Sequence, residues 1–124
     1  MPESLGLLTE SFTYDKLFAG NYPTVTKSVV VLLGQNILRG TVLGKVTASG
    51  KYVKSLAAAA DGSQFPDAIL AEDANASTED LTRIAYVSGE FNTNALVLGT
   101  GHTVTSVDAD LRDKNIYLKT AIAS

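Results

Sequence analysis

The chain has 124 residues, of which 45% are hydrophobic and 19% are charged, so it can bury one core and is not disordered throughout. Ten basic and thirteen acidic residues give a formal net charge of −3, which argues against a nucleic-acid-binding protein that relies on phosphate neutralisation. Cysteine is absent, which excludes disulfides and thiolate metal sites, and no apolar run is long enough to span a bilayer.

The first 21 residues show no sustained helical or strand period, and their aromatic side chains lie among Gly, Ser, Thr and Asn. Phe12, Thr13 and Tyr14 alternate in polarity, so they could become a strand if another sheet offered its edge. A frayed chain terminus explains the same composition. We expect residues 1–21 to be an arm and residues 22–124 to be one β-rich domain.

The first clear strand signal is the β-branched run at residues 26–33, which stops at a turn cluster over residues 34–36. An apolar stretch follows over residues 37–47, interrupted by Gly40 and Gly44. Glycines at such positions mark a bulge or a close approach of two backbones.

The middle of the chain alternates short strands with polar connections. Residues 51–54 read as an edge strand, and residues 57–66 as a loop with at most one helical turn. Residues 67–73 and 81–88 read as strands, joined by a polar connection over residues 74–80.

The single predicted helix comes late in the chain. Apolar residues recur at spacings of three and four over residues 104–111, and Thr105 can cap this helix with Asp108 three residues on. Asn115 can end it, after which residues 116–119 read as a short strand. The resulting picture is a mainly β (β-rich α+β) domain with one amphipathic helix.

Charge is unevenly distributed along the sequence. Residues 1–15 carry three acids and no base, residues 16–60 carry six bases and no acid, and residues 61–80 carry six acids and no base. These blocks could neutralise each other within the domain or meet across a subunit boundary. A solvated surface with clustered signs is the simplest explanation.

Catalytic motifs are scarce. His102 is the only histidine, so a metal site would have to be completed by carboxylates, and acid–base catalysis would need a nucleophile nearby. A loop histidine that satisfies a backbone group or lies in solvent is the favoured interpretation.

Three runs of the sequence resemble the lambda-type bacteriophage head decoration proteins (capsid-stabilising protein D family). They are residues 35–46, residues 61–64 leading into 68–73, and residues 87–92. The likeness covers most of the chain from about Leu17 to Leu118.

This resemblance implies a small barrel-like (β-tulip-type) domain that forms homotrimers. Such proteins bind the outside of the expanded phage capsid at local three-fold positions and stabilise it against internal DNA pressure. The partner would be the major capsid protein, with no catalytic activity, cofactor, metal, small-molecule substrate, nucleic acid or membrane involved. The protein would be made in the host cytoplasm and reside on the virion exterior.

The family's N-terminal arm orders on binding and adds to the edge of a capsid sheet. By this resemblance the candidate capsid-binding residues of the arm are Phe12, Thr13, Tyr14, Leu17 and Phe18.

Two other hypotheses remain open at the level of sequence. A small β-barrel module could bind a carbohydrate or peptide on exposed Tyr52, Tyr86 and Phe91. A hydrolase could be built around His102 with Asp or Ser partners.

Overall fold

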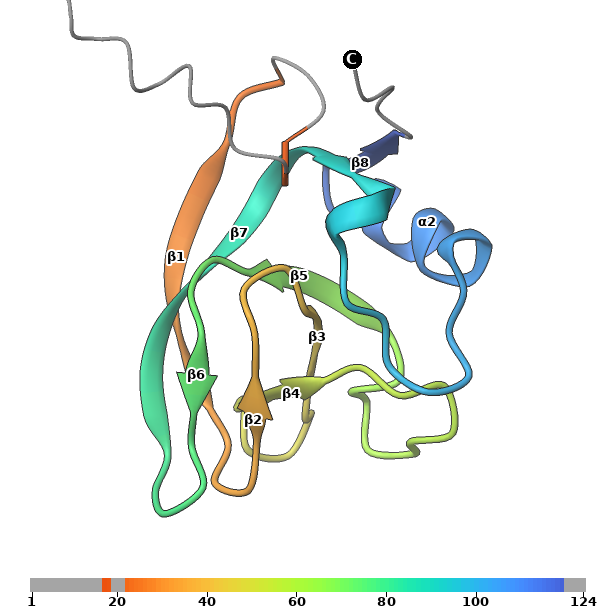
Figure 1. Ribbon diagram of the computed structural model, residues 1–124. Coiled ribbons are helices and arrows are strands. Elements are labelled where there is room, and N and C mark those ends of the chain that lie inside the picture. Colours follow the sequence, from red (N-terminus) through yellow and green to blue (C-terminus); the bar gives the residue numbers. More distant parts are fainter. Residues whose placement is uncertain (1–16, 19–21, 120–124) are drawn as a thin grey trace, which may run out of the picture.

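The computed structural model describes residues 17–18 and 22–119 (Figure 1). In chain order its elements are β1 (Val25–Val31), β2 (Asn36–Ile37), β3 (Val42–Lys45), β4 (Tyr52–Lys54), β5 (Pro66–Leu70), β6 (Ala74–Asn75), β7 (Leu81–Asn92), the 3-10 helix η2 (Thr93–Ala95), α2 (Val104–Arg112) and β8 (Ile116–Lys119).

Five strands close a small barrel in the order β1–β4–β3–β5–β7, with β7 pairing back onto β1. Strand β8 extends the sheet on the far side of β7, while β2 and β6 form a separate two-stranded ribbon. The fold is therefore mainly β with a barrel-like domain, as the sequence and the resemblance predict.

The barrel depends on the antiparallel pairing of β1 with β7. Seven residue pairs join the two strands, from Val25 opposite Ser88 to Val31 opposite Leu81, with a register shift after Val25. Val29 and Val31 point into the barrel and are buried, as period-two alternation requires. The strand expected at residues 26–33 is thus one residue longer at its start and two residues shorter at its end.

Strand β7 is longer than the sequence predicts, since it continues through Gly89 to Asn92. Its first part pairs with β1, and its last four residues pair in parallel with β8. Phe91, in this last part, is fully buried. One strand therefore belongs to both the barrel and the layer that carries the helix.

Two apolar clusters form the core. The first fills the barrel with the side chains of Val29, Val31, Ile37, Leu43, Tyr52, Ala68, Leu70, Ala74, Ala76 and Ala85. The second packs the helix against the outer side of the barrel with Leu17, Val42, Ile69, Phe91, Val107, Leu111 and Ile116.

Gly44 confirms the expected close approach of two backbones. A Cβ atom built at this position would lie 1.9 Å from the carbonyl oxygen of Ser63. Only glycine lets β3 and the loop before β5 pack at this distance.

The structure corrects the segment between β5 and β7. The strand expected at residues 67–73 is Pro66–Leu70, and Glu72 and Asp73 lie beyond it. Their carboxylates accept hydrogen bonds from the backbone N–H groups of Ile84 and Arg39, at 2.9 and 2.8 Å. The connection expected at residues 74–80 also contains the short strand β6.

The helix forms where expected, but its cap differs. Thr103 is the N-cap and forms a capping box with Ser106, in place of Thr105 with Asp108. The helix ends at Arg112, and Asn115 adopts a φ of 67°, which turns the chain into β8. Val107 and Leu111 are buried, so the predicted apolar face is the packed face.

Candidate functional site

Of the five predicted arm residues, Leu17 and Phe18 lie in the described part of the chain, and Phe12, Thr13 and Tyr14 lie outside it. Leu17 is only 2% exposed, and its carbonyl oxygen accepts a hydrogen bond of 2.7 Å from the backbone N–H of Asn92. Leu17 therefore packs with the domain, although the sequence places it in the predicted arm.

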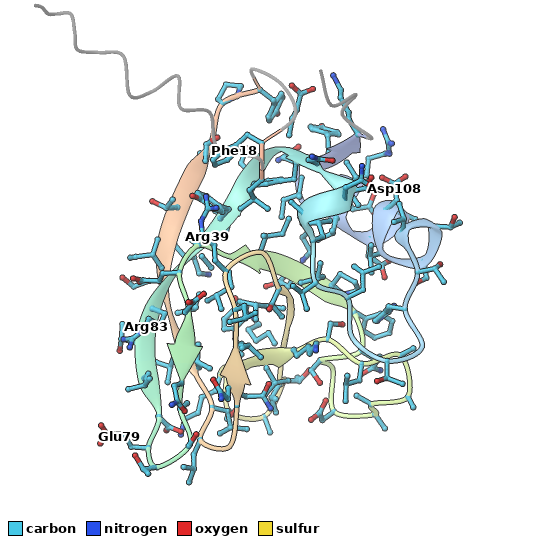
Figure 2. The ribbon with its side chains drawn as sticks, viewed as in Figure 1. Phe18, Arg39, Glu79, Arg83 and Asp108 are labelled. Atoms are coloured by element: carbon cyan, nitrogen blue, oxygen red, sulfur yellow. The ribbon has the colours of Figure 1, made fainter. Side chains whose placement is uncertain are left out.

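Phe18, which is labelled in Figure 2, holds the same part of the chain through ring contacts with β7. It forms an antiparallel bridge with Phe91, and the centroids of the two rings lie 5.3 Å apart. Its ring also meets Tyr86 edge-on at 5.2 Å. Aromatic pairs of this kind add to the stabilisation from burial alone.

A second attachment lies just before β1. The backbone N–H of Tyr22 donates to a carboxylate oxygen of Glu90 at 3.0 Å, and Lys119 pairs with the same carboxylate at 2.8 Å. The Tyr22 ring meets Tyr117 edge-on at 4.9 Å. Partial desolvation raises the pKa of Tyr22, and the neighbouring Tyr117 adds to this rise. Leu17 and Phe18 are thus held on β7, and Tyr22 is held on β7 and β8.

His102 satisfies a backbone group, which is the first of the two alternatives that the sequence favours. Its Nε2 atom lies 3.0 Å from the carbonyl oxygen of Gln64, which can only accept, so Nε2 carries the proton. The Nδ1 atom lies 2.9 Å from the hydroxyl of Ser106 in α2. His102 therefore joins the loop before β5 to the start of the helix.

The surroundings of His102 do not assemble a nucleophile. Ser55 Oγ lies 3.2 Å from Nε2, but it is fully buried and donates to the carbonyl oxygen of Ser63 at 2.7 Å. No carboxylate among the described residues makes a hydrogen bond to the imidazole, so the third member of a catalytic triad is missing from this part of the chain. The arrangement serves packing.

The three aromatics of the carbohydrate or peptide hypothesis do not form an exposed platform. Tyr52 and Phe91 are 3% and 0% exposed, and they belong to different core clusters. The Tyr52 hydroxyl donates to Asp67 at 3.0 Å. Burial, followed by the Asp67 charge, raises the pKa of Tyr52 to about 12. The hypothesis of an exposed aromatic platform is therefore wrong for Tyr52 and Phe91, while Tyr86 is partly buried against the second cluster.

The charge blocks of the sequence partly neutralise each other within the domain. Lys51 from the basic block pairs with Asp80 from the acidic block at 2.6 Å. Hydrogen bonds from Lys51 and from the backbone N–H of Leu33 hold the pKa of Asp80 below its usual range. Lys27, Lys45 and Lys54 form no ion pair within residues 17–18 and 22–119.

Clusters of metal-ligating side chains and long apolar helices are both absent from residues 17–18 and 22–119. No three His, Asp or Glu residues there group closely enough to hold a metal ion, and no helix in this part is both long and apolar enough to cross a bilayer.

One surface was missed by the sequence analysis: the outer edge of β1, which exposes the polar run Thr26, Lys27 and Ser28. The signal was the change from these three polar residues to the apolar Val29–Val31 within one predicted strand. The apolar half of the strand, Val29–Val31, packs with the domain, and the polar half stays exposed.

The comparisons with known proteins agree with the resemblance. A family model for the bacteriophage lambda head decoration protein D matches residues 7–115. The match begins ahead of Leu17 and ends at Asn115, just before β8. No curated protein matches the sequence.

Proposed function

Since the chain belongs to the bacteriophage lambda head decoration protein D family, it is a structural protein of a phage capsid, and we propose that it acts as a homotrimeric cement on the outside of the expanded head. In this role it binds the major capsid protein at local three-fold positions and stabilises the shell against internal DNA pressure. We propose no catalytic activity and no cofactor.

The observation that carries this proposal is the family match, because it spans both the N-terminal segment and the barrel. In the proposal Phe12, Thr13 and Tyr14 add as a strand to a capsid sheet, where backbone hydrogen bonds give affinity and alternate side chains give specificity. The contacts of Leu17 and Phe18 with β7 support a fixed base for this arm.

Weak arms suffice if three of them act together. After the first arm of a trimer binds, each later attachment is intramolecular, and the overall affinity can exceed that of one arm by about 10² to 10⁴. Binding that favours the expanded lattice stabilises it by the difference in affinity between the expanded and immature states. The proposal places the protein on the virion exterior after its synthesis in the host cytoplasm.

The test is attachment of purified protein to expanded and immature shells that lack it, together with the oligomeric state by analytical ultracentrifugation. We expect trimers and attachment to the expanded shells. Replacing both Phe12 and Tyr14 with alanine should abolish attachment without changing thermal stability, while Ser11→Ala serves as the matched control. Attachment that survives the double change would remove the arm from the proposal, and absence of wild-type attachment would overturn it.

Deletions need a boundary chosen from the structure. Removing residues 1–20 would also remove the buried Leu17 and the Phe18 ring, so loss of attachment could come from a damaged core. Removing residues 1–15 keeps Leu17 and Phe18 in place, so a loss of attachment then comes from the missing arm.

A further inference from the structure

Among the barrel strands, β1 and β4 are the least completely paired neighbours. These two strands pair in parallel at a single position, Val31 opposite Tyr52. On its other side β1 pairs with β7 over its whole length. Within the described residues, the outer edge of β1 from Val25 to Val29 therefore has no strand beside it (Figure 1).

The hydrogen bonds of β7 determine which backbone groups of β1 face this edge. Ile84, opposite Ser28, uses both of its backbone groups on the side away from β1. Its N–H donates to Glu72 at 2.9 Å, and its carbonyl oxygen accepts from the N–H of Ala71 at 2.9 Å. The N–H and C=O of Ser28 must then point to the outer edge, and by alternation so do those of Thr26.

This edge is accessible. Residues 25–28 are exposed on both faces of the strand, and Val25 is 51% exposed. The edge carries one charge, Lys27, whose Nζ lies 6.0 Å from the centroid of the Tyr52 ring and pairs with no carboxylate in the described ranges. An exposed strand edge is a template for the addition of another strand.

A second copy of the chain fits this edge poorly. Two β1 edges that pair through Thr26 and Ser28 would place Lys27 opposite Lys27, and like charges directly opposite destabilise a strand pair. Such a pair also has two-fold symmetry, so it joins two copies and leaves no matching edge for a third.

The chain's own N-terminal segment also fits poorly. Phe18 and β1 both run antiparallel to β7, Phe18 at Phe91 and β1 from Ser88 onward. Residues 17–18 thus precede β1 in the same direction on the same edge of β7. A segment before Leu17 would have to reverse its direction to cover the outer edge of β1.

We propose that the outer edge of β1 accepts an extended segment of the major capsid protein, hydrogen-bonded to Thr26 and Ser28 and carrying an acidic side chain near Lys27. This inference rests on the proposed function and adds a second contact to it. The arm donates a strand to the capsid, and β1 accepts one from it.

Protection of a unique thiol tests occupancy of the edge directly, because the natural chain has no cysteine. In full-length Thr26→Cys, maleimide labelling should be fast in the free protein and about tenfold slower or more on expanded shells. Ser49→Cys, in the turn between β3 and β4, is the control and should label equally in both. Equal labelling of Cys at position 26 in both states overturns the inference, and slow labelling in the free protein assigns the edge to another part of the chain or to a second copy.

Affinity for expanded shells gives an independent measure. Ser28→Pro removes the outward N–H, is compatible with an edge position, and should weaken binding about three- to tenfold, whereas Ser28→Ala keeps the N–H and should bind normally. Lys27→Glu should also weaken binding, while Lys45→Glu makes the same charge change on β3, which has strands on both sides. Circular dichroism checks the fold, and Lys27→Glu remains informative if Ser28→Pro fails to fold.

The two proposals fail differently. Wild-type protein that does not bind shells overturns the proposed function. Wild-type binding that Ser28→Pro and Lys27→Glu leave unchanged overturns only the role of the β1 edge.

Discussion

Leu17→Ala tests whether the chain that leads into the arm is part of the folded domain. Leu17 is 2% exposed within the second core cluster, so nearly the whole side chain is removed from water. Deleting three buried carbon atoms costs about 2.4 kcal/mol at about 0.8 kcal/mol each. The cavity left in this cluster raises the expected loss to about 3–4 kcal/mol.

Urea unfolding followed by circular dichroism measures this loss, at a fixed protein concentration because self-association would add to the apparent stability. The midpoint should fall with an unchanged m-value, and the melting temperature should fall by about 10 °C or more. Leu38→Ala is the matched control, since Leu38 is 59% exposed and its truncation should change stability by less than about 0.5 kcal/mol.

A loss below about 1 kcal/mol for Leu17→Ala would refute the reasoning, because a buried leucine cannot be truncated so cheaply. That result would mean that the segment before β1 detaches from β7 in solution. The arm would then lack the fixed base on which the proposed attachment depends.

Three further changes probe other parts of the domain. Gly44→Ala should destabilise the protein by several degrees in melting temperature or prevent folding, because its Cβ would meet the Ser63 carbonyl oxygen at 1.9 Å; a normal thermal melt would contradict this packing. Because the pKa of Tyr52 is raised to about 12, this residue stabilises the fold below its unfolded pKa of 10, and the contribution should disappear as pH rises from 10 to 12. The absorbance titration of tyrosinate should lose its highest-pH step in Tyr52→Phe, and an unchanged curve would refute the assignment. His102→Ala removes the hydrogen bonds that join the start of α2 to the loop before β5, so it should lower the free energy of unfolding by about 1 kcal/mol and leave attachment to expanded shells intact. Loss of attachment in a fully folded variant would point to a direct role for the imidazole.

Local sequence patterns predicted most of the regular structure. The β-branched run before Gly34 is β1, the spacing of Val107 and Leu111 marks the packed face of α2, and Asn115 ends the turn after it. These predictions succeed because strand alternation, helical periodicity and left-handed turns depend on residues only a few positions apart.

Local patterns failed where the hydrogen-bond partner of one side chain decides the outcome. The helix cap moved to Thr103 because Ser106 completes a reciprocal pair of hydrogen bonds there. Glu72 lies outside the strand that was predicted to contain it because its carboxylate accepts a hydrogen bond from the backbone N–H of Ile84, twelve positions away. Neither choice is visible in residue propensity.

The composition and motif order of the sequence by themselves determined a β-rich, cysteine-free decoration-family chain and an N-terminal segment with an alternating aromatic run. The tertiary structure alone decided that Leu17 and Phe18 join the core and that Tyr52 and Phe91 are buried rather than displayed. It also decided that no strand among the described residues covers the edge of β1 at Thr26 and Ser28. The physical reason is that burial and strand pairing are set by contacts such as Leu17 with Asn92, which lie 75 positions apart in the chain. No window of local sequence contains both partners.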